Sequence, residues 1–385
     1  MKICYLADAE SIHTQRWVQY FADQGHQVHL ISKNPCAQLK GIKQHHLKRL
    51  NESEAFSAVN LLVILPQVKS IIKKVAPDIL HSHFVLDYGS YGAMSGFHPF
   101  VISAWGSDVL EVPKRSKSLR ALTRYALNGA DLITCDGDNS KEAMIHLGIP
   151  DGKIKIISHG IDTNRFYPGT RNENIRVELG LSGHPSAISI RHLRPVYDVG
   201  SFIRSMPLVL KEIPDAKFII VGDGSDKEFL IKLAGSLGIL NSVIFTGVIN
   251  HEELPSYIAS SDVYVSTSIS DGGIAVSTLE AMASGLAPVV TDVGDNRKWI
   301  KDGENGFVVP IGDSKMLAER IIYLLQNKDV LRRFGAANRS IVEERADYYK
   351  EMEKMGRIYE DLVGGNQNED NSYWRRWIHR QSSLR

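Results

Sequence analysis

Short apolar runs alternate with segments of helical periodicity along almost the whole chain. In the first half these runs include ICYLA, QVHLIS, DILHSH, FVISA, DLITCD and KIKIIS, and in the second half AISI, KFIIVG, SVIFTG, DVYVS and APVVTD. Such alternation predicts parallel sheets with helices on both faces, because parallel strands are joined by long crossovers that are usually helical. We therefore predict an α/β protein with doubly wound, Rossmann-like parallel sheets.

The length of 385 residues exceeds what one ordinary hydrophobic core supports. We predict a first domain over residues 1–160 and a second over residues 161–350. Residues 351–385 are predicted to form a C-terminal helix and tail. Ligands of doubly wound sheets bind at the carboxyl ends of the strands, so the predicted site is a cleft between the two domains.

Composition excludes several classes of protein. A hydrophobic content of 43% and a charged content of 23% are typical of a globular protein, and the formal net charge of +1 gives no overall attraction to nucleic acid. The three cysteines have no metal-type spacing and are predicted to be reduced, buried thiols, which favours a cytoplasmic location. No run approaches the roughly 18 to 20 apolar residues of a membrane span, so any membrane contact is expected to be peripheral.

The segment from residue 260 to residue 312 carries the strongest functional pattern. An apolar run, Val263–Ser266, is followed by the loop SISDGGIAVS, a helix that opens with TLEAMASG, and a second apolar run, LAPVV. A loop that leads from a strand into a helix start presents free N–H groups and the positive end of the helix dipole, which suits a phosphate. Ser277 and Thr278 lie at this start, and Glu280, placed in the first turn, is suited to accept hydrogen bonds from ribose hydroxyls. The pattern predicts a nucleotide site.

The same segment resembles the donor half of the retaining glycosyltransferases of the GT-B fold, in glycosyltransferase family 4. The wording LEAMASG at 279–285, and Asn305, Gly306 and Phe307 after it, carry the resemblance, and SHGIDTNRFYP at 158–168 is similar to the interdomain segment of that family. The resemblance implies two Rossmann-like domains that face a cleft, with the nucleotide sugar on the second domain and the acceptor on the first. It also implies that Glu280 binds the ribose and that no cofactor or obligatory metal is needed.

The family uses an arginine, and a lysine about five residues later, to neutralise the donor diphosphate. Arg191 corresponds to the arginine, whereas Tyr197 and Asp198 stand near the lysine position. A guanidinium binds phosphate bidentately and is able to carry more of that work alone. Two solvated surface arginines, Arg191 and Arg194, are the simpler alternative.

The family also places a second acid eight residues before the helix glutamate, where it contacts the donor sugar. Gly272 stands at that position here, and Asp271 comes one residue earlier. Either the loop shifts to bring in the Asp271 carboxylate, or Gly272 and Gly273 allow the backbone to approach the sugar closely. Gly222, Asp223 and Gly247 end two further strands at places that match the donor site of the family, although glycine at a strand end is more often only a turn.

Candidate residues of the acceptor side lie in the first half of the chain. The resemblance implies that Asp108, in SAWGSDVL, orients or deprotonates an acceptor hydroxyl. Ser11, His13, His83 and Trp105 also end or follow predicted strands. Ser11 suits a helix cap equally well, His13 a packed pair with Trp17, and His83 a buried core position.

The C-terminal tail SYWRRWIHRQSSLR combines Trp374 and Trp377 with Arg375, Arg376 and Arg380. A basic, aromatic helix is suited to the anionic inner face of a membrane, where a lipid-linked acceptor would be met. In the GT-B architecture the last helix instead packs back on the first domain, and we favour that alternative.

We predict a retaining glycosyltransferase that moves a sugar from a nucleotide sugar to a hydroxyl of a saccharide or lipid-linked saccharide, in the synthesis of a cell-surface polysaccharide. The catalytic residues are predicted to be Arg191 and Asp108. Two alternatives stay open: a degenerate, non-enzymatic binding subunit, which the acid missing at Gly272 and the lysine missing near Tyr197 motivate, and a nucleotide-sugar epimerase.

Overall fold

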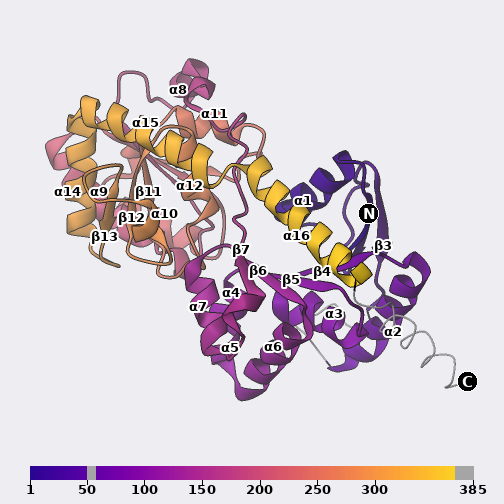
Figure 1. Cartoon of the computed structure of the whole chain (residues 1–385). Coiled ribbons are helices and arrows are strands. Elements are labelled where there is room, and N and C mark those ends of the chain that lie inside the picture. Colours follow the sequence, from indigo (N-terminus) through magenta and orange to yellow (C-terminus); the bar gives the residue numbers. More distant parts are fainter. Residues whose placement is uncertain (50–57, 369–385) are drawn as a thin grey trace, which may run out of the picture. The chain divides into compact units, whose positions relative to one another are not determined.

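Two all-parallel sheets organise the chain in the computed structural model, which describes residues 1–49 and 58–368. Unit 1 comprises Met1–Ile157 and Glu351–Arg385, and unit 2 comprises Ser158–Lys350 (Figure 1). The predicted α/β class with doubly wound parallel sheets is confirmed.

Unit 1 contains a seven-stranded sheet in the order β3-β2-β1-β4-β5-β6-β7. Its strands are β1 (Lys2–Leu6), β2 (Gln27–Ser32), β3 (Ile42–His46), β4 (Ile79–His83), β5 (Phe100–Ala104), β6 (Leu132–Cys135) and β7 (Ile154–Ile156). Its helices before residue 158 are α1 (Ile12–Asp23), α2 (Ala58–Val75), η1 (Val85–Gly89), α3 (Ser90–Ser95), α4 (Ser107–Leu110), α5 (Val112–Arg115), α6 (Lys117–Gly129), α7 (Asp138–His146) and the 3-10 turn η2 (Asp151–Lys153). The predictions did not include β3 or the helical turns from η1 to α5.

Unit 2 contains a six-stranded sheet in the order β10-β9-β8-β11-β12-β13. Its strands are β8 (Ser186–Ile190), β9 (Lys217–Val221), β10 (Val243–Gly247), β11 (Val263–Ser266), β12 (Ala287–Thr291) and β13 (Phe307–Val309). Its longer helices are α8 (Glu173–Glu178), α9 (Val199–Glu212), α10 (Lys227–Ser236), α11 (Leu254–Ala259), α12 (Val276–Ala283), α14 (Ser314–Gln326) and α15 (Lys328–Arg345), with a short turn α13 (Asn296–Trp299).

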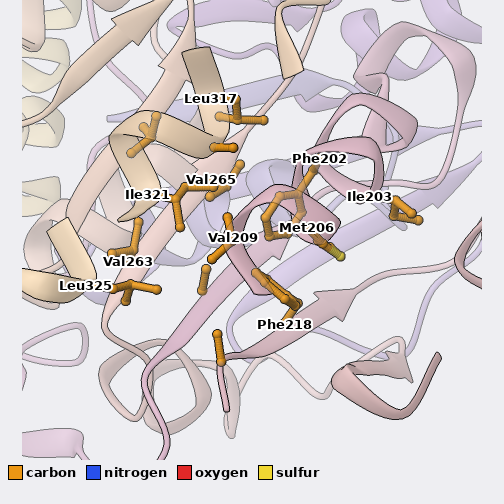
Figure 2. Packing of buried hydrophobic residues seen from close by; sticks show 14 of the residues in the cluster. Phe202, Ile203, Met206, Val209, Phe218, Val263, Val265, Leu317, Ile321 and Leu325 are labelled. Carbon is orange, nitrogen blue, oxygen red and sulfur yellow. The ribbon is translucent and has the colours of Figure 1, made fainter. Parts of the chain in front are cut away.

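The strands of unit 2 bury side chains on both faces. Phe218, Val263 and Val265 lie in one core with α9 and α14, where Met206 and Ile321 meet them (Figure 2). The residues between them in the strands, such as Ile219 and Tyr264, belong to a second core with α11 and α12 on the opposite face. This period of two is what a central parallel strand requires, and it explains why these strands read as continuous apolar runs.

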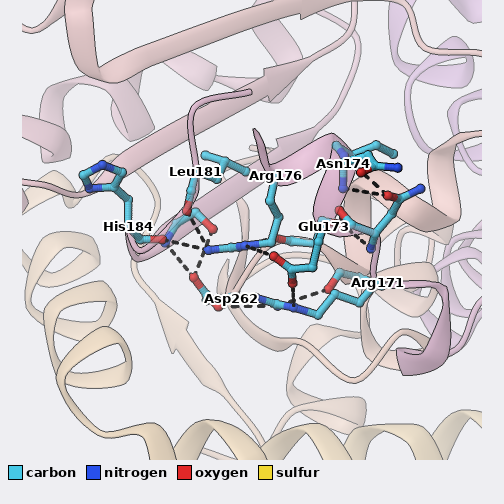
Figure 3. A network of polar contacts seen from close by, with 12 residues as sticks. Arg171, Glu173, Asn174, Arg176, Leu181, His184 and Asp262 are labelled. Atoms are coloured by element: carbon cyan, nitrogen blue, oxygen red, sulfur yellow. Dashed lines mark hydrogen bonds and ion pairs between the residues drawn. The ribbon is translucent and has the colours of Figure 1, made fainter. Parts of the chain in front are cut away.

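A polar network fixes the entry of the chain into the second sheet. The buried Arg176 on α8 donates to the carbonyl oxygens of Ser260, Leu181 and His184, the last two at 2.7 and 3.1 Å (Figure 3). Asp262 accepts from the backbone N–H of Ser186 at 2.8 Å. These bonds tie the start of β8 to the start of β11 and so fix their register.

The last described helix, α16 (Tyr348–Asn368), covers one face of the unit 1 sheet next to α1 (Figure 1). The hydroxyl of Tyr359 lies 3.0 Å from the hydroxyl of Tyr5 on β1 and also contacts Nδ1 of His81 on β4. Nε2 of His81 lies 2.8 Å from Oγ of Ser103 on β5. Burial lowers the pKa of His81 to about 3, so the ring is neutral at pH 7.

The predicted basic aromatic tail, with Trp374, Arg375, Arg376, Trp377 and Arg380, lies outside the described residues. None of the helices within residues 1–49 and 58–368 combines the length and apolar character needed to cross a membrane. All three cysteines are free thiols, and Cys4 and Cys135 are buried as predicted, whereas Cys36 is only half-buried.

Tyr359→Phe should lower the free energy of unfolding by about 1 to 3 kcal/mol, because Nδ1 of His81 would lose its hydroxyl partner in a dry core. Urea unfolding followed by circular dichroism measures the change. Tyr349→Phe, on the exposed side of the same helix, is the matched control and should change stability by less than about 0.5 kcal/mol. Equal effects of the two substitutions would contradict a specific role for the Tyr359 hydroxyl.

Candidate functional site

The donor-side candidates gather at one edge of the unit 2 sheet. Strand β8 pairs with β9 on one side and β11 on the other, so the strand order reverses at β8. The loops that follow β8 and β11 therefore leave the same edge of the sheet at adjacent positions, where doubly wound folds bind ligands. Arg191 opens the first loop and Asp271 lies in the second.

Arg191 is held between a carboxylate and an aromatic ring. Its Nη2 donates to Oδ1 of Asp271 at 2.6 Å, and its Cζ lies 4.4 Å from the centre of the Tyr197 ring. The side chains of Arg191 and Asp271 are only 10% and 14% exposed, so neither is a solvated surface charge. Burial by itself disfavours the charged guanidinium, but Asp271 more than compensates and raises the pKa of Arg191.

The start of α12 lies against the same guanidinium. Nη1 of Arg191 lies 3.5 Å from Oγ of Ser277, and Ser277 Oγ lies 2.8 Å from the hydroxyl of Tyr264 on β11. Thr278 donates to the Tyr264 hydroxyl at 3.4 Å. The structure thus brings Arg191, Asp271, Ser277 and Thr278 together, with Tyr264 beneath them.

The position of Glu280 within its helix corrects the sequence prediction. The helix α12 begins at Val276 with Ala275 as its N-cap, so Glu280 lies in the second turn and no acid lies in the first. The backbone N–H groups of Val276 and Ser277 have no hydrogen-bond partner among the residues that the structure describes. These two donors and the helix dipole still form the predicted anion-binding end.

Glu280 is a buried carboxylate on the helix face that carries Ser277, three residues earlier. Its side chain is 6% exposed, and its Oε1 lies 3.7 Å from Nε2 of His251, in the loop after β10. The carbonyl oxygen of His251 in turn accepts a hydrogen bond from the Arg165 guanidinium. The His251 ring packs edge-on against the Phe166 ring, with 5.9 Å between the ring centres. Glu280 therefore lies within reach of the edge where Arg191 lies.

One of the predicted glycines, Gly222, allows the backbones of neighbouring loops to touch. Gly222 has a φ of 134°, and a Cβ atom there would lie 2.2 Å from the carbonyl oxygen of Arg191. Its N–H donates at 2.8 Å to the carbonyl oxygen of Gly247. Asp223 instead forms an ion pair with Lys227 at 2.6 Å on a half-exposed surface, and this contact lowers the pKa of Asp223. The roles of these residues in donor binding stay predictions.

The loop that carries Asp271 is fixed on both sides. Before it, Ile269 N–H donates to the carbonyl oxygen of Val196 at 2.9 Å. After it, the carbonyl oxygen of Gly273 accepts from Asp295 N–H at 3.1 Å, and Gly294 approaches so closely that a Cβ atom would lie 2.2 Å from that oxygen. Gly272 lies between these two attachment points.

In unit 1, Asp108 joins two loops at the carboxyl edge of the sheet. Its Oδ2 accepts from Val85 N–H at 2.9 Å and its Oδ1 from Trp105 N–H at 3.0 Å, and the side chain is fully buried. Burial raises its pKa to about 6, although these backbone N–H groups act in the opposite direction. Asp108 therefore stabilises the loops after β4 and β5, and its predicted catalytic role is not tested by this geometry.

The other acceptor-side candidates lie around the same edge. The ring of Trp105 lies 5.0 Å from the ring of His83 and 5.9 Å from that of His13. His83 is buried, and its Nδ1 contacts Oγ1 of Thr14 at 3.2 Å. Ser11 is the N-cap residue of α1, but its side chain makes no capping hydrogen bond. His13, His83 and Trp105 thus form one aromatic cluster, with Ser11 at the start of α1.

The sequence reasoning missed several residues of these edges. His251 and Tyr264 gave no recognisable pattern, because one is an isolated loop residue and the other lies inside an apolar strand. In unit 1 it missed Lys33, which follows β2 and forms a buried ion pair with Asp87 in η1. Burial raises the pKa of Asp87, and the Lys33 charge acts against this shift.

No group of three or more His, Cys, Asp or Glu side chains is arranged to hold a metal ion within the part of the chain that the structure describes. The Arg191 guanidinium and the N-terminal end of α12 bring positive charge to the unit 2 edge, alongside the acidic side chains of Asp271 and Glu280.

Comparison with known families matches both halves of the chain. The family described as "Glycosyl transferases group 1" matches residues 171–341, and the family "Glycosyl transferase 4-like" matches residues 2–137. These two regions lie in unit 2 and unit 1, respectively.

Individual relatives are similar over different shares of their length. The N-acetyl-alpha-D-glucosaminyl L-malate synthase of Bacillus anthracis is 24% identical over 356 residues, which is 90% of this chain and 92% of the relative. A GDP-mannose-dependent phosphatidylinositol monomannoside mannosyltransferase of Mycobacterium tuberculosis is 26% identical over 58% of this chain and 60% of its own length. The solved structure of Anabaena HepE in complex with UDP has a TM-score of 0.80 and 19% identity, covers 94% of this chain and is itself covered fully. It shows the same fold.

Asp108→Asn should change how stability depends on pH. Because the folded-state pKa of Asp108 is about 6 and the unfolded value is about 3.9, the folded protein binds more protons here between these pH values. The contribution of Asp108 is therefore largest below about pH 4 and declines as the pH rises to about 6. The asparagine does not titrate, so the stability of the wild-type protein relative to Asp108→Asn should fall by about 1 kcal/mol between about pH 5 and about pH 7.

Urea unfolding of both proteins at the two pH values measures this difference, and the histidines, which titrate in both proteins, cancel from it. A difference that stays constant or grows with pH would contradict the raised pKa of Asp108.

Proposed function

Because the chain belongs to the glycosyl transferases group 1 family, we propose that it is a retaining glycosyltransferase that uses a nucleotide-diphosphate sugar as donor. The acceptor is a hydroxyl of a saccharide or a lipid-linked saccharide. Unit 2 binds the donor, and unit 1 binds the acceptor.

One observation carries the proposal: a buried guanidinium, two free helix N–H groups and a buried carboxylate lie at the strand-order reversal of unit 2. Arg191 contacts Ser277 at the start of α12, and Glu280 lies one turn further along the same helix. Arginine and a helix N-terminus both bind phosphate, and a carboxylate accepts hydrogen bonds from ribose hydroxyls. The start of α12 and Glu280 lie one helical turn apart, as the adjacent diphosphate and ribose of one nucleotide require. The HepE neighbour, whose structure contains UDP, supports a nucleotide ligand for this fold.

In the proposed reaction, the acceptor oxygen forms a bond to the anomeric carbon on the face from which the diphosphate leaves. The bond between that carbon and the phosphate oxygen breaks, and its electron pair stays on the phosphate. The proton of the acceptor hydroxyl passes to the departing phosphate oxygen, so no protein base is required. Arg191 and the N–H groups of Val276 and Ser277 stabilise the charge that develops on the phosphate, and for this reason we propose no obligatory metal.

On the acceptor side, we propose that the edge with His13, His83 and Trp105 contacts the acceptor, because aromatic faces and polar ring edges suit sugar rings. Asp108 acts here as a positioning residue, since its two oxygens hold the loops that carry Trp105 and η1. The mannosyltransferase relative, which by its name acts on a phosphatidylinositol monomannoside, supports a lipid-linked acceptor. We further propose a place in cell-surface polysaccharide synthesis.

A non-enzymatic binding subunit is the second candidate, since Gly272 replaces the usual acid and Tyr197 lies near the position of the usual lysine. The two candidates differ in ligand binding. An enzyme of the proposed kind must bind a nucleoside diphosphate at the unit 2 edge, whereas a scaffold has no such requirement.

Thermal unfolding in the presence of nucleotides should distinguish these functions. We expect UDP or GDP at millimolar concentration to raise the melting temperature, because a ligand that binds only the folded state stabilises it. Parallel samples with dTDP, CMP and buffer alone identify the nucleobase. The absence of any shift with all four nucleotides would contradict the proposed function.

Glu280→Gln should reduce kcat/KM for the nucleotide sugar by roughly ten- to hundredfold, because a hydrogen bond to a charged group contributes about 1.5 to 3 kcal/mol. Glutamine keeps the size of the side chain, so the stability of the fold should change little. The release of nucleoside diphosphate in the presence of acceptor measures the rate.

Glu319→Gln is the matched control, because Glu319 is an exposed glutamate on α14 in the same unit. It should leave kcat/KM unchanged. Full activity of Glu280→Gln would remove Glu280 from the donor site, and formation of an epimerised nucleotide sugar without acceptor would instead support an epimerase.

A further inference from the structure

Asp271 pairs with the same guanidinium that the proposed donor diphosphate would use. Its Oδ1 is 2.6 Å from Nη2 of Arg191, and the two side chains are 14% and 10% exposed. A diphosphate that bound this guanidinium bidentately through its two terminal nitrogens would compete with the Asp271 carboxylate for Nη2. The internal ion pair and the proposed donor therefore depend on the same cation.

The path of the loop does not depend on this ion pair. Thr267 Oγ1 donates to the carbonyl oxygen of Asp198 at 2.8 Å, and Ile269 N–H donates to the carbonyl oxygen of Val196 at 2.9 Å. Beyond Asp271, Gly273 is held by Asp295 N–H at 3.1 Å. Because the backbone is attached on both sides, the Asp271 side chain is able to change partner without moving the rest of the loop.

The charge around Arg191 makes this exchange necessary. Within the described residues its side chain contacts Asp271, Ser277 and the Tyr197 ring, and none of these is a second cation. A diphosphate brings at least two negative charges to a guanidinium that already faces one carboxylate. Three anionic charges around one buried cation repel each other strongly at low dielectric.

We propose that Asp271 is an internal counter-ion that competes with the donor diphosphate for Arg191 and thereby favours the release of the nucleoside diphosphate product. This inference rests on the proposed function of the unit 2 edge. When an intact nucleotide sugar binds, the displaced Asp271 carboxylate accepts a hydrogen bond from a hydroxyl of the donor sugar. Asp271 stands one residue before the position at which the family has its sugar-binding acid. After transfer the sugar is gone, the carboxylate loses that partner, and it pairs again with Arg191 in competition with the diphosphate.

The decisive experiment compares the dissociation constants of UDP and GDP for the wild-type protein and for Asp271→Asn by isothermal titration calorimetry. Asparagine keeps the shape of the side chain but removes its charge. We expect whichever nucleoside diphosphate binds to bind at least tenfold more tightly to Asp271→Asn and to inhibit turnover more strongly as product. The corresponding nucleoside, which has no phosphate, should bind both proteins equally.

Two variants serve as matched comparisons. Asp329→Asn, which removes a carboxylate from an exposed ion pair with Arg332 on α15, should leave the dissociation constant unchanged. Asp271→Glu keeps the charge and should bind the nucleoside diphosphate as weakly as the wild-type protein.

A third variant keeps the inference testable if Asp271→Asn fails to fold because Arg191 loses its partner. Tyr197→Lys leaves the ion pair intact and adds the second cation, so it should also bind the nucleoside diphosphate more tightly. Unchanged or weaker binding by a folded Asp271→Asn variant, while the wild-type protein binds the nucleotide, would overturn the inference alone. Failure of the wild-type protein and all variants to bind either nucleotide would overturn the proposed function together with it.

Discussion

The pairing of β8 with both β9 and β11 is the constraint on which the rest of unit 2 depends. It brings the loop after Ile190 and the loop after Ser266 to adjacent positions at one edge, and so brings Arg191 and Asp271 together although 79 residues separate them in the sequence. The pairing is itself stabilised by side chains that alternate between two cores, with Val263 and Val265 on one face and Tyr264 on the other. The hydroxyl of Tyr264 reaches the start of α12 from this buried position, so one strand serves the core and the site.

The same logic applies to unit 1, where the strand order reverses between β1 and β4. There the hydroxyl of Tyr359 joins α16 to β1 and β4, and Asp108 joins the loops after β4 and β5. Residues 351–368 are therefore a structural part of the first sheet's covering layer, although they follow unit 2 in the sequence. Of the aromatic cluster in this unit, His13 lies on α1 and His83 on β4, and Trp105 lies on a loop that Asp108 holds in place.

Most strands could be predicted because buried parallel strands read as continuous apolar runs. Two edge strands, β3 and β13, could not be predicted. Ile42–His46 contains a lysine, a glutamine and two histidines, and Phe307–Val309 has only three residues. The start of α12 was misplaced because its N-cap is Ala275, which gives none of the usual capping signals. The resemblance indicated Arg191 and Glu280, but contacts such as Tyr197 against Arg191 join side chains across a turn and follow from no sequence period.

The two departures from the family pattern have one physical explanation. Tyr197 stands near the position of a lysine, so the site carries one cation fewer, and Asp271 stands one residue before the usual acid, where it neutralises the cation that remains. A buried guanidinium without a counter-ion would strongly destabilise the fold in the absence of ligand. The ring of Tyr197 and the carboxylate of Asp271 supply that compensation from two different loops. The compensated pair thus keeps Arg191 charged and buried in the absence of a ligand, as the proposed donor site requires.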